Sequence, residues 1–401
     1  MDTRFNQVRN DDDSRFPVKY HHLSYLDGLR GLAALYVVLT HACLEVTRDH
    51  TFTEFPFFIQ KITDWLGFGA VAVDIFIVLS GYCLMLPVAR SKGKKLHGGV
   101  SQYLFRRARR ILPPYYIALV LSLLLIAIVP GMNQIEGKLW DMALTAFTPS
   151  CIVSHLLLVH NLTGCLFTID PPMWSVAIES QIYFLFPLLL LPVWRRFGNI
   201  ITIIVGFVIG LSPHFLLHKG DTSCPWFLGL FTLGMVAAVF NVSYSIPPKQ
   251  LSRWSLALCV FTLTLFLLAI RTMCSKYITD TLAGFTTAFL LVFLTNHCYQ
   301  FAQSPKPFLL KLMESPGAVL LGTFSYSLYL IHFPILSLFH LWIRPLHLSA
   351  IEQLALLLTV GTLISIILSY IFHLLFERRF MPGSPMTLKQ AIDAVKGSPA
   401  P

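Results

Sequence analysis

"SYLDGLRGLAALYVVLTHA", from Ser24 to Ala42, has the apolar density of a membrane-spanning helix and still contains ionisable side chains. These side chains are Asp27, Arg30 and His41. A helix needs about 20 predominantly apolar residues to cross a bilayer. Ionisable residues inside such a helix are rare and costly, and they mark functional sites by default. The stretch therefore predicts a first membrane span that carries part of a functional site.

The rest of the chain repeats this apolar character in long blocks. Of its 401 residues, 55% are hydrophobic and 12% are charged, and the mean hydropathy is +0.67. A soluble protein carries about 25% charged residues. Ten blocks are long enough to cross a membrane, and they lie near residues 26–46, 68–88, 112–130, 174–193, 200–218, 225–243, 254–272, 278–296, 318–341 and 352–376. We predict an all-α integral membrane protein with about ten transmembrane helices.

The basic charge is distributed as a topology signal. The net charge is +10, a value that by itself could indicate nucleic acid binding. With a cytosolic N-terminus and ten alternating spans, 22 Lys and Arg residues fall in cytosolic segments and 7 fall in the opposite loops. This asymmetry is the positive-inside bias of membrane proteins. We therefore expect both termini in the cytosol, anionic lipid headgroups as secondary partners and no nucleic acid.

A single transmembrane domain is expected. The predicted divisions are a cytosolic N-terminal tail at 1–24, the transmembrane domain at 25–377 and a cytosolic C-terminal tail at 378–401. The first 22 residues are polar, so no cleavable signal peptide is predicted and the first span is the insertion signal. The membrane would be the endoplasmic reticulum or another endomembrane in a eukaryote, and the inner or plasma membrane in a bacterium.

A long loop at 131–173 is expected on the non-cytosolic side, between the third and fourth spans. Its apolar part, 140–168, is interrupted by polar residues and predicts a re-entrant or interfacial segment. Cys151 and Cys165 share this loop and could form a disulfide, although unpaired cysteines are also common at apolar sites. Asn161, two residues before Thr163, is a candidate glycosylation acceptor. The eight cysteines show no metal-ligand spacing, so no metal is predicted.

Arg30 and His41 point the same way from the first span. They are 11 residues apart, which is three helical turns plus about 20°, and about 16 Å separates them along the axis. Asp27 lies one turn before Arg30. Asp27 and Arg30 could simply lie at the cytosolic headgroups, where arginine snorkels to water. His41 lies deeper, and it is either bonded structurally to a neighbouring helix or part of a functional site.

Four ionisable residues on four predicted spans fall at similar depths. They are His41, Asp74, Glu179 and His332. Lone charges that face lipid are costly, so these residues should converge in the interior and pair. A carboxylate beside a histidine sets its tautomer and raises its basicity, as a general base requires. The alternative is that Asp74 and Glu179 bind hydroxyls or helix N-termini for structural reasons.

An arginine-rich segment, "FRRARRILPPYY" from Phe105 to Tyr116, precedes the third predicted span. Its arginines are Arg106, Arg107, Arg109 and Arg110. Positive-inside anchoring is one explanation for them. The other is phosphate binding, because the guanidinium fork matches phosphate and a helix start at Pro113 and Pro114 would add backbone donors. Coenzyme A is a cytosolic ligand that carries a pyrophosphate and a ribose phosphate.

These segments resemble the acyltransferase 3 family of integral-membrane acyltransferases, from about Tyr25 to Glu377. The first is "LDGLRGLAAL" followed by His41, which is the family's pattern of an arginine, ten residues and a histidine. The others, in family order, are "VDIFIVLSGYCL", "RRARRILPPYY", "MWSVAIESQIYFLFP" and "FSYSLYLIHFP". One departure is "FERRF", where the family more usually has Glu-Arg-Pro. No esterase-like domain follows the last span, which predicts a stand-alone member.

The resemblance implies transfer of an acyl group, usually acetyl, from acyl-coenzyme A to a hydroxyl, with no tightly bound cofactor. It makes His41 the catalytic base or a transient acyl carrier, and it makes Arg30 the residue that orients the donor or its thioester carbonyl. The residues that complete the catalytic set are Asp74 and Glu179, which would orient and tune His41, together with Tyr326 and His332. The residues that would bind the phosphates of coenzyme A are Arg106, Arg107 and Arg110.

Two other classes of protein compete with a transferase. A proton-coupled transporter also buries His, Asp and Glu, but the sequence shows no matched broken helices of an inverted repeat. A non-catalytic lipid or sterol sensor would be free to lose ionisable residues that are intact here. For the acceptor, the 32 phenylalanines favour a hydroxylated small molecule, such as a terpenoid or polyketide of a secondary-metabolite pathway. A glycan or lipid hydroxyl is the alternative acceptor.

Overall fold

Helices alone build the fold in the part of the chain that the structure describes. The computed structural model describes residues 22–50, 55–91, 93–135, 139–144, 148–217, 223–242, 246–301 and 304–381. The predicted tails at 1–24 and 378–401 lie outside the described residues, apart from 22–24 and 378–381.

The longer helices follow one another along the whole described chain. They are α1 (Ser24–Asp49), α3 (Ala70–Arg90), α4 (Gly99–Ile128), α7 (Met173–Leu185), α8 (Leu191–Leu217), α9 (Phe227–Val242), α10 (Pro248–Arg271), α11 (Lys276–Gln300), α14 (Ser325–Ile343) and α16 (Thr362–Phe372). The shorter α-helices are α2 (Phe57–Leu66), α5 (Asp141–Leu144), α6 (Pro149–Leu156), α12 (Phe308–Met313), α13 (Pro316–Thr323) and α15 (Ala350–Leu356). Turns of 3-10 or π type are η2 (His160–Leu162), η3 (Phe186–Leu190), η5 (Arg344–Leu346), η6 (Leu357–Gly361), η7 (His373–Glu377) and η8 (Arg378–Phe380).

Eight helical segments of the described chain are long and apolar enough to cross a membrane. One of them, Met173–Leu216, is 44 residues long and is kinked at Gly198, whose φ of 80° lies in the left-handed region that glycine tolerates. That kink separates the fourth and fifth predicted spans. Another apolar helix, α9, has only 16 residues. All ten predicted blocks overlap helices, while the count of ten spans and the cytosolic termini stay predictions.

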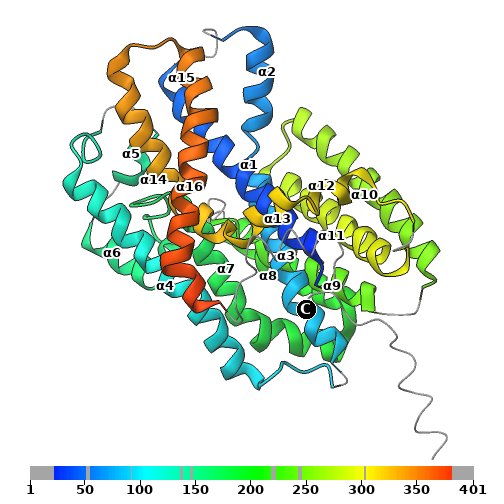
Figure 1. Cartoon of the computed structure of the whole chain (residues 1–401). Helices are drawn as coiled ribbons and strands as arrows, with labels where there is room; N and C mark the ends of the chain where they lie inside the picture. The colour runs from blue at the N-terminus through cyan, green and yellow to red at the C-terminus, as the bar shows by residue number, and fades with distance from the viewer. Residues whose placement is uncertain are drawn as a thin grey trace, which may run out of the picture.

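The first predicted span, α1, lies inside the helical assembly. Figure 1 shows it between the C-terminal helices α14 and α16 and the helix α3. Its close contact with α13 depends on glycine on both helices. A Cβ atom at Gly31 would overlap the carbonyl oxygen of Ala318, and a Cβ atom at Gly322 would overlap that of Asp27. Small residues that let two backbones approach are typical of helix contacts in membranes. The polar side chains of α1 can therefore meet protein groups rather than lipid.

The loop at 131–173 folds into short helices that pack against α4 and α7. Its described part contains α5, α6 and η2. From α4, the hydroxyl of Tyr115 donates to the carbonyl of His155 at 3.1 Å, and that of Tyr116 donates to the carbonyl of Leu156 at 2.7 Å. These bonds hold α6 against the side of α4.

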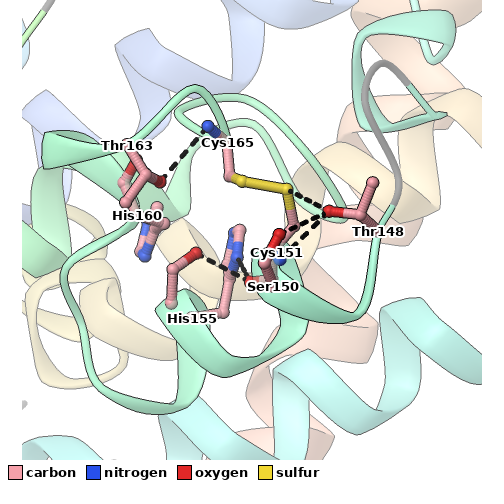
Figure 2. The surroundings of a disulfide bond; sticks show 8 residues. Thr148, Ser150, Cys151, His155, His160, Thr163 and Cys165 are labelled. Atoms are coloured by element: carbon pink, nitrogen blue, oxygen red, sulfur yellow. Dashed lines mark hydrogen bonds between the residues drawn. A yellow bond between two sulfur atoms is a disulfide. The ribbon is translucent and has the colours of Figure 1, made fainter.

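Of the two alternatives for Cys151 and Cys165, the structure has the disulfide. Figure 2 shows that it joins α6 to the turn after η2. Beside it, the rings of His155 and His160 stack with centroids 3.8 Å apart and planes 6° apart. Burial lowers the pKa of His155, and it lowers the pKa of His160 to about 3. The loop therefore combines a covalent link with a stacked pair of neutral histidine rings.

The glycosylation predicted at Asn161 does not fit the folded loop. This residue is only 4% exposed, and its amide pairs with the amide of Gln181 on α7. Nδ2 of Asn161 donates to Oε1 of Gln181 at 3.2 Å, and Nε2 of Gln181 donates to Oδ1 of Asn161 at 2.7 Å. The backbone carbonyl of Asn161 accepts from Ser223 as well. An N-linked glycan must project from the surface, so this packing leaves no room for one.

Candidate active site

One cavity collects five of the ten site residues that the sequence predicted, and His41 and His332 are not part of its lining. Its volume is about 280 Å³. It lies between the N-terminal part of α1, the middle of α3, α4, α7 and the start of α14. The predicted residues in its lining are Arg30, Arg107, Arg110, Glu179 and Tyr326.

Arg30 is held in the cavity wall by two partners. Its Nη1 donates to Oδ1 of Asp27 at 3.0 Å, and its Nη2 donates to Sγ of Cys83 at 3.0 Å. The Arg30 side chain is 22% exposed, so it does not snorkel into bulk water. Three guanidinium groups and one carboxylate line the cavity, which gives the lining a net positive charge that suits an anionic ligand. Among the described residues, no group of three or more His, Cys, Asp and Glu could hold a metal ion.

Two of the predicted phosphate-binding arginines face this cavity. Arg107 and Arg110 lie one turn apart on α4 and line it. Arg106 faces elsewhere, because its Nη2 donates to the carbonyl of His97 at 2.9 Å and it is absent from the lining. Arg109 is exposed and also lies outside the lining. The structure therefore does not bring Arg106 together with Arg107 and Arg110, the other two arginines predicted to bind phosphate.

The helix that carries these arginines begins earlier than the sequence predicts. It starts at Gly99 and continues through Pro113 and Pro114. Proline has a φ value compatible with a helix, so each ring removes only one hydrogen bond and crowds the carbonyl one turn earlier. In a membrane, neighbouring helices can compensate for that loss. The predicted helix start at these prolines, with its free N–H groups for phosphate, is therefore wrong.

Glu179 lies in the cavity wall, where its partners are hydroxyl groups. Its Oε1 accepts from Oγ of Ser80 at 2.5 Å and from the hydroxyl of Tyr183. Tyr326 lines the same cavity and donates to a backbone carbonyl of α4 at 3.0 Å. The expected pairing of Glu179 with His41 is not present, because the carboxylate is held by these hydroxyls instead.

His41 and His332 form a hydrogen bond between α1 and α14. Nδ1 of His41 lies 3.0 Å from Nε2 of His332 and 3.1 Å from the carbonyl oxygen of Val37. Nδ1 of His332 lies 2.9 Å from the carbonyl oxygen of Tyr329 and 3.0 Å from that of Leu328.

This pattern assigns the tautomers of both rings. Because a carbonyl oxygen only accepts, Nδ1 of His332 carries a proton, and Nε2 of the neutral ring must accept. His41 therefore donates from its Nδ1. Its Nε2 then has no proton, and a nitrogen in that state can act as a base.

The histidine pair lies between the cavity and the 131–173 loop. Tyr329 lines the cavity, and its ring centroid is 6.0 Å from that of His332. On the other side, His41 contacts the edge of Phe333 at 5.3 Å between centroids. Phe333 in turn stacks on Trp140 of the loop at 5.8 Å. Tyr329 therefore connects the histidine pair to the cavity lining, and Phe333 connects it to the loop.

Asp74 is separated from the histidine pair. It is fully buried, and the charged groups that act on it most strongly are Asp280 and Lys276 of α11. Nζ of Lys276 donates to Oδ2 of Asp280 at 2.6 Å. One face of α3 lines the cavity, and its residues at helical spacing include positions 73, 76, 77, 80 and 83. Asp74 lies on a different face of the helix. The structure therefore does not bring Asp74 to His41 as expected, which leaves the alternative of a structural role for Asp74.

Six polar residues of the cavity were missed in the sequence: Ser80, Cys83, Ser175, Tyr183, Ser325 and Tyr329. A signal for the first four of these is present. Ser175 and Tyr183 lie one turn before and one turn after Glu179, so they share its face of α7. Ser80 and Cys83 are three residues apart within the Ser-Gly segment of α3. Extending each predicted residue along its own helix face would have found them.

Comparisons with known proteins identify one family. Residues 23–374 match the family described as "Acyltransferase domain". A Staphylococcus aureus (strain COL) protein named "Putative O-acetyltransferase" is 27% identical over 350 residues, which cover 80% of this chain and 52% of that protein. The "Peptidoglycan O-acetyltransferase OatA" of Listeria monocytogenes is 25% identical over 349 residues, which cover 81% of this chain and 51% of that protein. The chain thus spans about half the length of the curated relatives it matches. No solved structure matches it.

Proposed function

This chain belongs to the acyltransferase domain family of membrane proteins, and we propose that it transfers acetyl from acetyl-coenzyme A to a hydroxyl group. The observation that carries the proposal is a cationic cavity next to a histidine pair in which His41 keeps an unprotonated Nε2. The names of the relatives support oxygen as the atom that is acylated. The charge of the cavity supports an anionic donor.

The three arginines of the cavity lining are the proposed site for the phosphates of the donor. They are Arg30, Arg107 and Arg110, and a guanidinium group binds phosphate through two parallel hydrogen bonds. Along α1, Arg30 and His41 are about 16 Å apart. Arg30 is therefore too far away to orient a thioester that reacts at His41, so we place it at the phosphate end. The pantetheine arm would run from there past Tyr329.

His41 is the proposed general base. Its Nε2 takes the proton of the acceptor hydroxyl while the hydroxyl oxygen attacks the thioester carbonyl. The C–S bond then breaks, and the proton passes to the coenzyme A thiolate, so an ester and a free thiol form. Nε2 of His332 accepts the hydrogen bond from the Nδ1–H group of His41 throughout the reaction, and this bond stabilises the imidazolium form of His41. A positioned base of this kind contributes about 10²–10⁴-fold in rate.

A hydroxylated small molecule, such as a terpenoid or polyketide, is the proposed acceptor. The cavity supports this choice because apolar side chains, including Val73, Phe76 and Val176, alternate with its polar groups. A glycan hydroxyl is the second candidate. The name of the Listeria relative, which specifies peptidoglycan, favours it.

The test is acetyl-coenzyme A turnover by the detergent-purified protein, with terpenoids, polyketides, sugars and peptidoglycan fragments as acceptors and mass spectrometry as the readout. We expect one acceptor to gain an acetyl group with the wild type and none with His41→Ala. If only glycans are acetylated, the acceptor is a glycan instead of a small molecule, and the proposed mechanism still holds. Full activity in His41→Ala would refute the mechanism. If the wild type does not bind acetyl-coenzyme A, a proton-coupled transporter becomes the better hypothesis.

A further inference from the structure

A second buried polar cluster joins α1 to α14, beyond the histidine pair along both helices. Glu45 of α1 is 1% exposed. Its Oε1 accepts from the hydroxyl of Ser337, and its Oε2 lies 3.1 Å from Nδ1 of His340. Ser337 and His340 both belong to α14 and are buried as well. The proposed reaction uses none of these three residues.

Gln353 of α15 closes the cluster. Its Nε2 donates to the carbonyl of Leu348 at 2.9 Å, and its Oε1 lies 3.3 Å from Nε2 of His340. Since an amide oxygen only accepts, Nε2 of His340 carries a proton. Both ring nitrogens of His340 and both carboxylate oxygens of Glu45 therefore have partners within the protein. The cluster does not line the cavity, so it offers a substrate neither a base nor a nucleophile.

The two polar contacts connect the same pair of helices at successive turns. On α1, Glu45 follows His41 by four residues, which is about one turn. On α14, Ser337 and His340 follow His332 by five and eight residues. The contacts advance in the same direction along both helices, so α1 and α14 run parallel. A slide or rotation of α14 against α1 would have to break both contacts together.

The histidine contact by itself is the weaker of the two links. It is a single hydrogen bond of 3.0 Å between neutral rings, and Nδ1 of His41 also faces a carbonyl of its own helix. The Glu45 cluster has more hydrogen bonds: Ser337 and His340 each contact one carboxyl oxygen of Glu45, and Gln353 contacts the other nitrogen of the His340 ring. We propose that Glu45 and His340 are positioning residues, an inference that rests on the proposed function. They set the register of α1 and α14 and so hold His41 in hydrogen-bond contact with His332.

The first test compares Glu45→Ala with Glu45→Gln. Because Glu45 acts only by holding the His41–His332 contact, Glu45→Ala should lower kcat no more than complete loss of that contact does, about 5- to 30-fold, and should leave the KM for acetyl-coenzyme A unchanged. Glutamine can accept from Ser337 and donate to Nδ1 of His340, so Glu45→Gln should keep kcat near wild type. The control is Asn296→Ala, which removes a buried hydrogen bond of 2.8 Å to the carbonyl of Pro248 outside this contact. It should leave kcat unchanged.

A double-mutant cycle separates positioning from general stability. If Glu45 acts through the histidine contact, Glu45→Ala should cause little further loss of kcat in a His332→Leu background, because coupled residues are not additive. Wild-type kcat in Glu45→Ala would overturn the inference. So would equal losses in Glu45→Ala and Glu45→Gln, a full additive loss in the double variant, or an equal loss in Asn296→Ala. Failure of the proposed function would give a different result from these: no turnover by the wild type, or full turnover by His41→Ala. Either result would refute both proposals.

Discussion

Replacing His332 with leucine tests the histidine pair most directly. Leucine favours a helix and keeps apolar bulk on α14. The change removes Nε2, which accepts from Nδ1 of His41, and it removes the donor to the α14 carbonyls. Nδ1 of His41 still has the carbonyl oxygen of Val37 at 3.1 Å. The base therefore stays in place but loses the group that stabilises its charged form.

The expected loss follows from the change in charge during the reaction. A hydrogen bond to a charged group contributes about 1.5–3 kcal/mol, and a neutral one contributes about 0.5–1.5 kcal/mol. The part gained only when His41 becomes an imidazolium is thus about 1–2 kcal/mol. Since about 1.4 kcal/mol is tenfold in rate, His332→Leu should lower kcat about 5- to 30-fold. His41→Ala removes the base itself and should lower kcat about 10²–10⁴-fold.

The assay is thiol release from acetyl-coenzyme A at saturating acceptor, with thermal unfolding measured on the same samples. The KM for acetyl-coenzyme A should not change, because the donor's phosphates are assigned to arginines of the cavity lining, which does not include His332. His297→Leu, on α11 and outside the cavity lining, is the control. Wild-type kcat in His332→Leu would show that the pair contributes nothing. A loss as large as that of His41→Ala, with normal unfolding, would show that His332 itself carries out the chemistry.

Three further predictions follow from the cavity and the loop. Arg107→Ala should raise the KM for acetyl-coenzyme A about 10- to 100-fold, because a charge-assisted hydrogen bond contributes about 1.5–3 kcal/mol, whereas Arg109→Ala on the same helix should not; equal effects would refute the phosphate assignment. Cys83 lines the cavity, so coenzyme A should slow its alkylation by a maleimide in a variant without other accessible cysteines, and unchanged labelling would place the donor elsewhere. In the unfolded loop, His160 takes up a proton near pH 6.5. In the folded loop it does so only near its lowered pKa, about 3. The stabilisation is therefore complete above pH 6.5 and is lost as the pH falls towards 3, by up to about 1.4 kcal/mol per pH unit. Unfolding measured at pH 7.5 and 5 should show this loss for the wild type, and His160→Phe, which keeps a ring beside His155, should show less of it; the same pH dependence in both would contradict the assignment.

The arginine-rich segment shows how far the sequence could go towards the site. The residue types indicated phosphate binding, and two arginines do line the cavity. The sequence could not show which two arginines line the cavity, because this depends on the rotation of α4 against its neighbours. Arg106 and Arg107 are adjacent in sequence, yet they point about 100° apart on a helix. The predicted start of α4 was also wrong. Pro113 and Pro114 are compatible with both a first turn and a helix interior, so the sequence around them does not fix where the helix begins.

The sequence by itself determined the features that depend on neighbouring residues along one helix. These are the apolar spans, the common face of Arg30 and His41, and the motifs that mark the family, because helical periodicity is a local property. Only the tertiary structure decided which polar groups meet. His41 and His332 are 291 positions apart and form a hydrogen bond, while Asp74 faces α11 and Glu179 faces the cavity. The depth of a residue in a span follows from its position in the chain, but its partner follows from the rotation and offset of whole helices, which are set by packing among all of them.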